Sequence, residues 1–205
     1  ALKLVEKEAC MKYKPMVIAV VNQFILWYTE PLQAIAETYH EGYKLGQQLG
    51  DTTFDVYNRS FLNQTNYLTG QNLSIVQTNA KERVQDLLSR KQMGFVRVGV
   101  LLHYHAIALR EGLHILDAGR VDDIPTIAEI DIASNIQSLS ESKIYQLMRA
   151  FLFRQFSDYS FDIMNLYEKM QLRPILAFGI FYEGLMCFLR SIAANDPASK
   201  ATWVS

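Results

Sequence analysis

Two histidines separated by one residue, His103 and His105, form the most suggestive pair for metal or acid–base chemistry in the sequence. On an α-helix, side chains two residues apart point about 200° away from each other, so this pair is not placed to hold one metal ion. His105 falls on an apolar helix stripe, which predicts a packed, hydrogen-bonded core histidine. His40 and His114 do not form the spaced ligand set that a zinc site needs. We therefore predict no metal and no cofactor in this chain.

A second candidate is the glycine series GYKLGQQLG, in which Gly42, Gly46 and Gly50 recur every four residues. A dinucleotide loop needs GxGxxG after a strand, a P-loop needs GxxxxGK[ST], and the sequence has neither. The first two glycines share one predicted helix face with Leu32, Ile35, Tyr39 and Leu49. Glycine costs helix propensity, so this pattern predicts a neighbouring helix that approaches closely, and not a phosphate loop.

Acidic side chains gather in segment 119–139, whose mixed periodicity fits either a long loop or a short helix. They are Asp122, Asp123, Glu129 and Asp131. Carboxylates that do acid–base work need a burying pocket that shifts their pKa values, and loop carboxylates are usually solvated. We predict solvated side chains here. The sequence thus assigns no catalytic, cofactor-binding or metal-binding residue, and it leaves the residues of any binding surface unknown.

Composition narrows the classes of function. The 205 residues are 50% apolar and 20% charged, with a net charge of −1. Nucleic-acid binders carry a clear excess of Lys and Arg, so we predict no nucleic-acid partner. No apolar run reaches the roughly 18 residues of a membrane span, which predicts no membrane insertion. The two cysteines, Cys10 and Cys187, lie far apart and fit plain thiols in a reducing compartment, so we expect a cytoplasmic location.

Helical periodicity, punctuated by proline and glycine, predicts an all-α chain. The expected helices cover about residues 3–28 (with an interruption before Pro15), 31–50, 51–70, 73–91, 94–118, 140–156, 158–172 and 175–194. Gly50 suits a left-handed helix C-terminus, and Asp51 suits the N-cap of the next helix. No alternating, β-branched run bounded by turns indicates a strand.

The same periodicity predicts which helix faces are buried. In 51–70 the buried face is Phe54, Tyr57, Phe61 and Leu68. In 94–118 it is Phe95, Val98, Leu102, His105, Leu109, Leu113 and Leu116. In 73–91 the exposed face is Lys81, Glu82, Arg83 and Asp86.

Hairpins of such helices recur about every 40–45 residues, and each is too small to bury its own core. We predict one α-helical repeat domain over 1–205, an α-solenoid of tetratricopeptide-like type with about eight to ten helices. A closed helical bundle is the alternative. The first residues already follow a helical pattern and the last five, ATWVS, stop abruptly, so we expect a segment excised from a longer protein.

The hairpin over 27–70 resembles one in the tetratricopeptide-like repeat region of large multidomain signalling proteins. The matching residues are Phe24, Trp27, Pro31, Gly42, Tyr43, Leu45, Gly46, Leu49, Gly50, Asp51, Tyr57, Gly70 and Leu73. Segment 159–189 is similar to a later repeat of that family, through Phe181, Tyr182 and Leu185. Residues 119–139 depart from the family pattern.

Proteins of that family join a serine/threonine-kinase-like domain, an AAA-type (STAND-class) ATPase domain and the repeat region. They often add sensor and histidine-kinase or cyclase output domains. The resemblance implies ATP binding by the parent protein, with the ATPase and kinase residues outside this segment.

Three classes of function follow. The first is a non-catalytic helical-repeat scaffold in signal transduction, which couples an ATPase or kinase module to output domains or binds a protein partner. Its partners would be neighbouring domains of the same chain or other proteins. The second is a ligand-sensing helical domain with a buried small-molecule site. The third is an enzyme with a helical-bundle fold. We expect no enzymatic activity in this segment.

Overall fold

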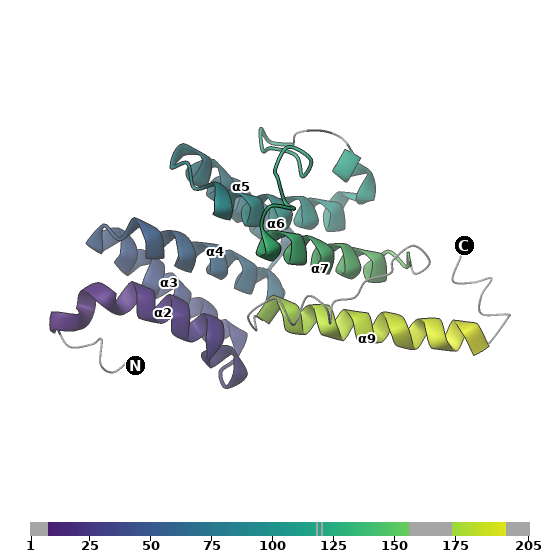
Figure 1. The fold of residues 1–205 in the computed structure, drawn as a ribbon, viewed down its shortest axis with the longest axis horizontal. Coiled ribbons are helices and arrows are strands. Elements are labelled where there is room, and N and C mark those ends of the chain that lie inside the picture. Colours follow the sequence, from purple (N-terminus) through teal and green to yellow (C-terminus); the bar gives the residue numbers. More distant parts are fainter. Residues whose placement is uncertain (1–7, 118, 120, 156–173, 196–205) are drawn as a thin grey trace. The chain divides into compact units, whose positions relative to one another are not determined.

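The computed structural model describes residues 8–117, 119, 121–155 and 174–195. These residues form seven α-helices and three 3-10 helices, and the bridge between Val121 and Ile124 is the only β-type pairing among them (Figure 1). The all-α prediction is confirmed. None of the described helices is long and apolar enough to cross a bilayer. The chain divides into two compact units, 1–130 and 131–205. The single solenoid domain stays a prediction.

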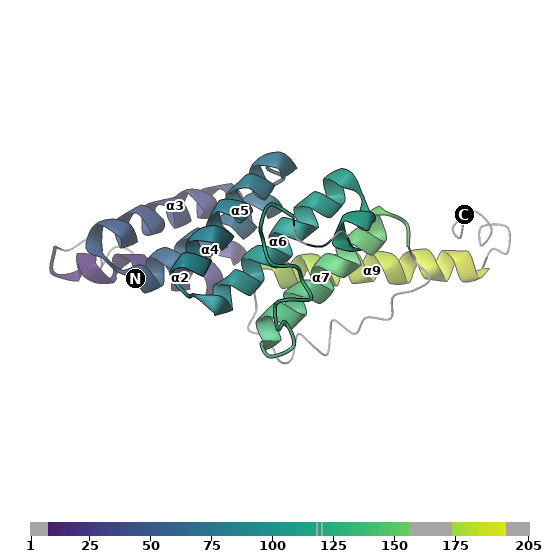
Figure 2. The ribbon, with the colours of Figure 1, turned by 90° about the horizontal axis from the view of Figure 1, so that it is seen from above.

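The first unit is built from two helical hairpins and one preceding helix (Figures 1 and 2). Its α-helices are α2 (Lys14–Phe24), α3 (Leu32–Leu49), α4 (Thr52–Leu68), α5 (Leu73–Ser89) and α6 (Met93–Glu111). Its 3-10 helices are η1 (Glu8–Tyr13), η2 (Leu26–Tyr28) and η3 (Leu113–Asp117). Helices α3 and α4 form one hairpin, and α5 and α6 form the other. Helix α2 packs on α3 and α4, and α4 also contacts α5 and α6.

The turn between α3 and α4 forms as the sequence predicts. Gly50 adopts the left-handed conformation with φ 69°, which a residue without Cβ reaches at no steric cost. Asp51 caps α4, and its Oδ1 accepts a hydrogen bond from the backbone N–H of Phe54 at 3.0 Å. The backbone N–H of Asp51 also closes the end of α3 by donating to the carbonyl of Gly46 at 2.9 Å.

In each hairpin of the first unit, the two helices approach closely at a glycine. A Cβ on Gly46 would lie 2.9 Å from the backbone nitrogen of Asp55, so α3 and α4 meet there backbone to backbone. A Cβ on Gly99 of α6 would lie 2.8 Å from a methyl group of Val84 on α5. The predicted close approach at the α3 glycines is confirmed.

Some helix boundaries differ from the predicted ones. The break before Pro15 is confirmed, because η1 ends at Tyr13 and α2 begins at Lys14 with the proline in its first turn. Helix α2 then ends at Phe24, before the predicted end at 28. Helix α6 ends at Glu111, because Gly112, with φ 104°, ends the helix before the predicted stop at Gly119.

The predicted buried face of α4 is largely wrong. Phe61 is buried, whereas Tyr57 is 36% exposed and Phe54 and Leu68 are half-buried. The helix instead buries mostly polar residues, because it lies among four other helices and hydrogen bonds join it to three of them, α2, α5 and α6. Its buried positions are Asp55, Val56, Asn58, Ser60, Phe61, Asn63, Gln64 and Thr65. In α6 every residue from 100 to 108 is buried, so the helix is covered all round and not along one stripe.

In the second unit, α7 (Ile136–Leu152) packs on α9 (Pro174–Asn195). Helix α7 begins before the predicted Ser140, because Asn135 caps it by accepting a hydrogen bond from the N–H of Ser138 at 3.0 Å. The rings of Phe151 and Tyr182 lie edge to face, with centroids 5.2 Å apart. The helix predicted over 158–172 lies outside the described residues.

Candidate functional site

The structure places His103 and His105 in the buried middle of α6, where both side chains are fully buried. Nε2 of His105 lies 2.6 Å from the hydroxyl of Tyr67 on α4, so the predicted hydrogen-bonded core histidine is confirmed. Nδ1 of His103 lies 3.4 Å from the carbonyl oxygen of Gln77 on α5. Within the described part of the chain, no three His, Cys, Asp or Glu side chains are grouped closely enough to hold a metal ion.

The imidazole of His103 has a lowered pKa. Burial lowers the pKa of its imidazole below the usual 6.5, because the charged form loses its hydration. The hydrogen bond to the Gln77 carbonyl and the charge of Asp122 oppose this shift, and the charge of Lys81 adds to it. Its Nε2 is buried and has no hydrogen-bond partner within the protein. This histidine is therefore neutral at pH 7 and packed, not poised as an exposed acid or base.

The carboxylates of segment 119–139 lie on the surface, as predicted. Asp122, Asp123, Glu129 and Asp131 are all exposed. In the first unit, Asp122 pairs with Lys81 at 3.1 Å, and Oε2 of Glu129 accepts from the N–H of Thr126 at 2.7 Å. The first contact joins the loop to α5, and the second closes a turn within the loop. The described residues 121–135 contain turns and no helix, so the loop alternative holds there.

A cluster of charged side chains on α4, α5 and the residue after α5 was not predicted. It consists of Arg59, Arg83, Asp55, Asp86 and Arg90, and we call it the charged cluster. Asp55 Oδ2 accepts from Arg90 Nη1 at 2.6 Å, and Asp86 Oδ1 accepts from Arg90 Nε at 2.7 Å. Asp86 Oδ2 accepts from Arg83 Nη1 at 2.6 Å and lies 3.6 Å from Arg59 Nη1.

Arg83 corrects the predicted exposed face of α5. Its side chain is 1% exposed, because it crosses to α4 and donates through Nη2 to the carbonyl oxygen of Val56 at 2.9 Å. The pKa of Arg83 is lowered to about 10, mainly by burial and also by the charge of Arg59, against the opposing charges of Asp86 and Asp55. The hydrogen bond to Asp55 raises the pKa of Arg90. Both guanidinium groups stay charged at pH 7, so the charged cluster suits binding and not proton transfer.

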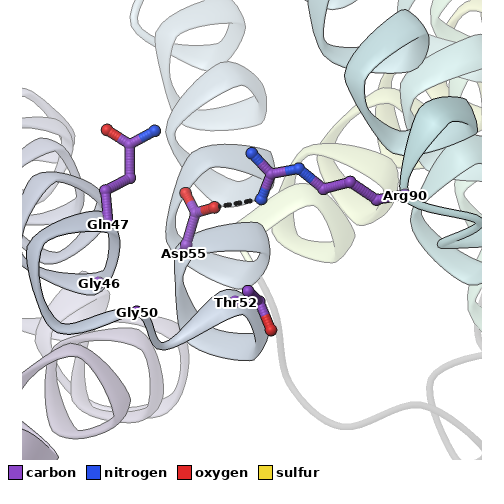
Figure 3. Close-up of a pocket in the computed structure, with 6 residues that line it drawn as sticks. All are labelled: Gly46, Gln47, Gly50, Thr52, Asp55 and Arg90. Carbon is purple, nitrogen blue, oxygen red and sulfur yellow. Dashed lines mark hydrogen bonds and ion pairs between the residues drawn. The ribbon is translucent and has the colours of Figure 1, made fainter.

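A pocket of about 280 Å³ opens beside the charged cluster at the α3–α4 turn (Figure 3). It is lined by Gly46, Gln47, Gly50, Thr52, Asp55 and Arg90. Figure 3 shows Asp55 between Gln47 of α3 on one side and Arg90 on the other. A second pocket, of about 220 Å³, lies at the α2–α3 corner and is lined by Leu26, Glu30, Ala34, Ile35 and Thr38. The first combines a buried carboxylate with a guanidinium, and it is the candidate site.

Part of the charged cluster leaves a signal in the sequence. Arg83 and Arg90 stand three residues before and four residues after Asp86, the spacings at which helical side chains meet. The contact between Arg90 and Asp55 leaves no signal in the sequence, because Asp55 lies on α4, 35 positions before Arg90. Asp55 lies off the helix face that the periodicity predicts to be buried, so the sequence gives no indication of its burial.

Comparison with known proteins gives no match to a family model, to a curated protein or to a solved structure. The resemblance of the α3–α4 hairpin to multidomain signalling proteins therefore stays a prediction.

Proposed function

We propose that this chain is a non-catalytic helical-repeat scaffold of a larger cytoplasmic signalling protein. It couples a nucleotide-driven ATPase or kinase module to output domains, or it holds a protein partner. The observation that carries this proposal is that four polar contacts bond α4 to the helices around it. Such contacts join the two hairpins of the first unit into one mechanical body, which is what a coupling element requires.

Four contacts bond α4 to its neighbours, one to α2 and three to the second hairpin. Asn58 Nδ2 donates to the Pro15 carbonyl of α2 at 2.9 Å. Asn63 Nδ2 donates to a carbonyl of α5, that of Asn79, at 3.3 Å. The other two are the Arg83 bond to the Val56 carbonyl and the pairing of Tyr67 with His105 of α6. Buried polar groups without partners are costly, so α2, α5 and α6 must keep their positions relative to α4.

The family resemblance and the thiols support the context. The α3–α4 hairpin carries the residues that resemble the signalling family, from Trp27 to Gly70. Both cysteines, Cys10 and Cys187, are free, which agrees with a reducing compartment.

Separately expressed flanking segments of the encoding gene test the proposal. Each would be titrated into the purified 205-residue chain by calorimetry, with and without ATP. We expect at least one flanking segment to bind nucleotide and to bind this chain with a dissociation constant of about 1 μM or below. Flanking segments that neither bind nucleotide nor bind this chain would contradict the scaffold role.

A ligand-sensing domain is the second candidate, and the pocket beside Asp55 and Arg90 favours it. Native mass spectrometry of the chain purified from its own host distinguishes the two. A small molecule that stays bound to the chain at unit stoichiometry would support the sensing role.

A further inference from the structure

The pocket at the α3–α4 turn contains a buried carboxylate oxygen that accepts no hydrogen bond within the protein. Asp55 is 3% exposed, and its Oδ2 is paired with Arg90. Its other oxygen, Oδ1, is buried and has no hydrogen-bond partner within the protein. A buried carboxylate oxygen without a donor costs free energy, so a donor that reaches it is bound favourably.

The same pocket offers hydrogen-bond donors. The side chain of Arg90 is one-third exposed and uses Nε and Nη1 on the two aspartates, Asp86 and Asp55. The guanidinium has further N–H groups in the same plane, since arginine carries five donors in a fixed fork. Gln47, which is exposed on the opposite side of Asp55, adds an amide that both donates and accepts (Figure 3).

The charges around the pocket disfavour ionic ligands. The charged cluster contains three arginines and two aspartates, which leaves one net positive charge. A cation would be repelled by this excess, and an anion would be placed against the Asp55 carboxylate. A neutral ligand with a donor next to an acceptor avoids both costs.

The pocket wall and volume limit the size of the ligand. Gly50 has no side chain, and a Cβ there would meet nothing within 4 Å, so a flat group can lie against the backbone of the turn. A pocket of about 280 Å³ is at the lower end for small-molecule sites, which are roughly 300–1,000 Å³. It therefore fits a single-ring compound better than a folded peptide segment.

We propose that this pocket binds a small uncharged ligand with an amide-type edge, an N–H beside a C=O, as in lactams and cyclic ureas. The ligand N–H donates to Asp55 Oδ1, and the ligand carbonyl accepts from Arg90 or Gln47. Oδ1 has less than 1 Å² of exposed surface, so the pocket lining must shift for the ligand N–H to reach it. This proposal does not depend on the scaffold role, because the site consists of residues around the α3–α4 turn together with Arg90.

Nuclear magnetic resonance of the ¹⁵N-labelled 205-residue chain tests the site. The probes are 2-pyrrolidinone and 2-imidazolidinone. We expect saturable shifts of the backbone N–H signals of Gly46, Gly50 and Thr52 and of the Arg90 Nε–H, with dissociation constants in about the millimolar range. N-methyl-2-pyrrolidinone keeps the carbonyl but lacks the N–H, and it should give no saturable shifts.

A matched pair of variants separates the pocket from the rest of the surface. Thr52 lines the pocket, whereas its exposed neighbour Thr53 does not. Thr52→Leu should fill the pocket and weaken binding of 2-pyrrolidinone at least ten-fold, while Thr53→Leu should leave it unchanged. The absence of saturable shifts with both probes would overturn the proposal. Equal binding by both variants, or stronger binding of acetate or guanidinium at this pocket, would also overturn it.

Discussion

The side-chain amide of Asn58 on α4 donates a hydrogen bond to the carbonyl oxygen of Pro15 on α2 at 2.9 Å. It reaches α2 across Gly42 of α3, where a Cβ would lie 2.7 Å from Asn58 Oδ1 and 2.8 Å from a methyl group of Ile18. Three helices thus meet at one glycine. Asn58 acts as a joint, because its hydrogen bond to the Pro15 carbonyl forms only when α2 lies beside α4, and Gly42 of α3 leaves the room for that contact.

Asn58→Ala should lower the free energy of unfolding by about 1–3 kcal/mol, since it removes buried bonds to the carbonyls of Pro15 and Phe54. Urea denaturation measures this change. Gln48→Ala, at an exposed position of α3, should change the free energy of unfolding by less than about 0.5 kcal/mol. Equal unfolding midpoints for the two variants would show that Asn58 is not a joint.

Gly46→Ala should destabilise the fold by about 1–3 kcal/mol, because the new Cβ would lie 2.9 Å from the backbone nitrogen of Asp55 and would force α3 and α4 apart. The control is Gly94→Ala in the first turn of α6, where a Cβ meets nothing within 4 Å. That variant should be neutral or slightly stabilising, since alanine favours helix over glycine. Thermal unfolding of both variants compares them directly, and a stable Gly46→Ala protein would contradict the close backbone contact.

Arg83→Ala should cost about 2–4 kcal/mol of unfolding free energy, because it leaves the Val56 carbonyl and Asp86 without their buried partner. Glu82→Ala alters the adjacent, exposed residue and should change the free energy by less than about 0.5 kcal/mol. Chemical denaturation distinguishes the buried arginine from a solvated one. A small, salt-sensitive effect of Arg83→Ala would indicate a surface ion pair instead.

His103 should make the fold less stable in acid. Burial holds its folded-state pKa below the usual 6.5, so the unfolded chain takes up a proton that the folded chain refuses. The stability contribution is complete above about pH 6.5 and is lost as pH falls below that value.

The charged groups near His103 are Lys81 on α5 and Asp122 in the following loop. Unfolding free energies at about pH 7.5 and pH 5.5, for the wild type and for His103→Gln, measure its contribution. The variant should show a smaller loss of stability between the two pH values. An identical loss in both proteins would mean that His103 does not contribute to the acid sensitivity.

Local signals in the sequence predict local structure well. The Gly50–Asp51 turn is correct because a left-handed glycine and an N-cap aspartate act within a few residues. The predicted end of α6 is wrong, because the sequence offers two glycines, Gly112 and Gly119, that could each end the helix. The structure adds the reason that the chain turns early. The hydroxyl of Tyr104 lies within 3.2–3.3 Å of the Gly119 and Ile124 carbonyls and of the Val121 N–H, which ties the loop back to α6.

Contacts between distant positions explain the remaining errors. Arg83 lies in a polar stretch of α5, and the periodicity of that stretch predicts exposure. It is buried because the Val56 carbonyl, 27 positions away, and the charged cluster compensate its loss of hydration. The candidate pocket depends on Asp55 and Arg90, which meet only after both hairpins have formed. No pattern within one helix contains that information.

The central claim is that the polar contacts of α4 hold the two hairpins of the first unit as one cooperative body. Native-state hydrogen exchange tests it most directly, by comparing the slowest amides of α3 and α4 with those of α5 and α6. We predict one shared free energy of opening, which Arg83→Ala lowers by the same amount in all four helices. Protection that falls in α5 and α6 but stays at the wild-type level in α3 and α4 would contradict the claim.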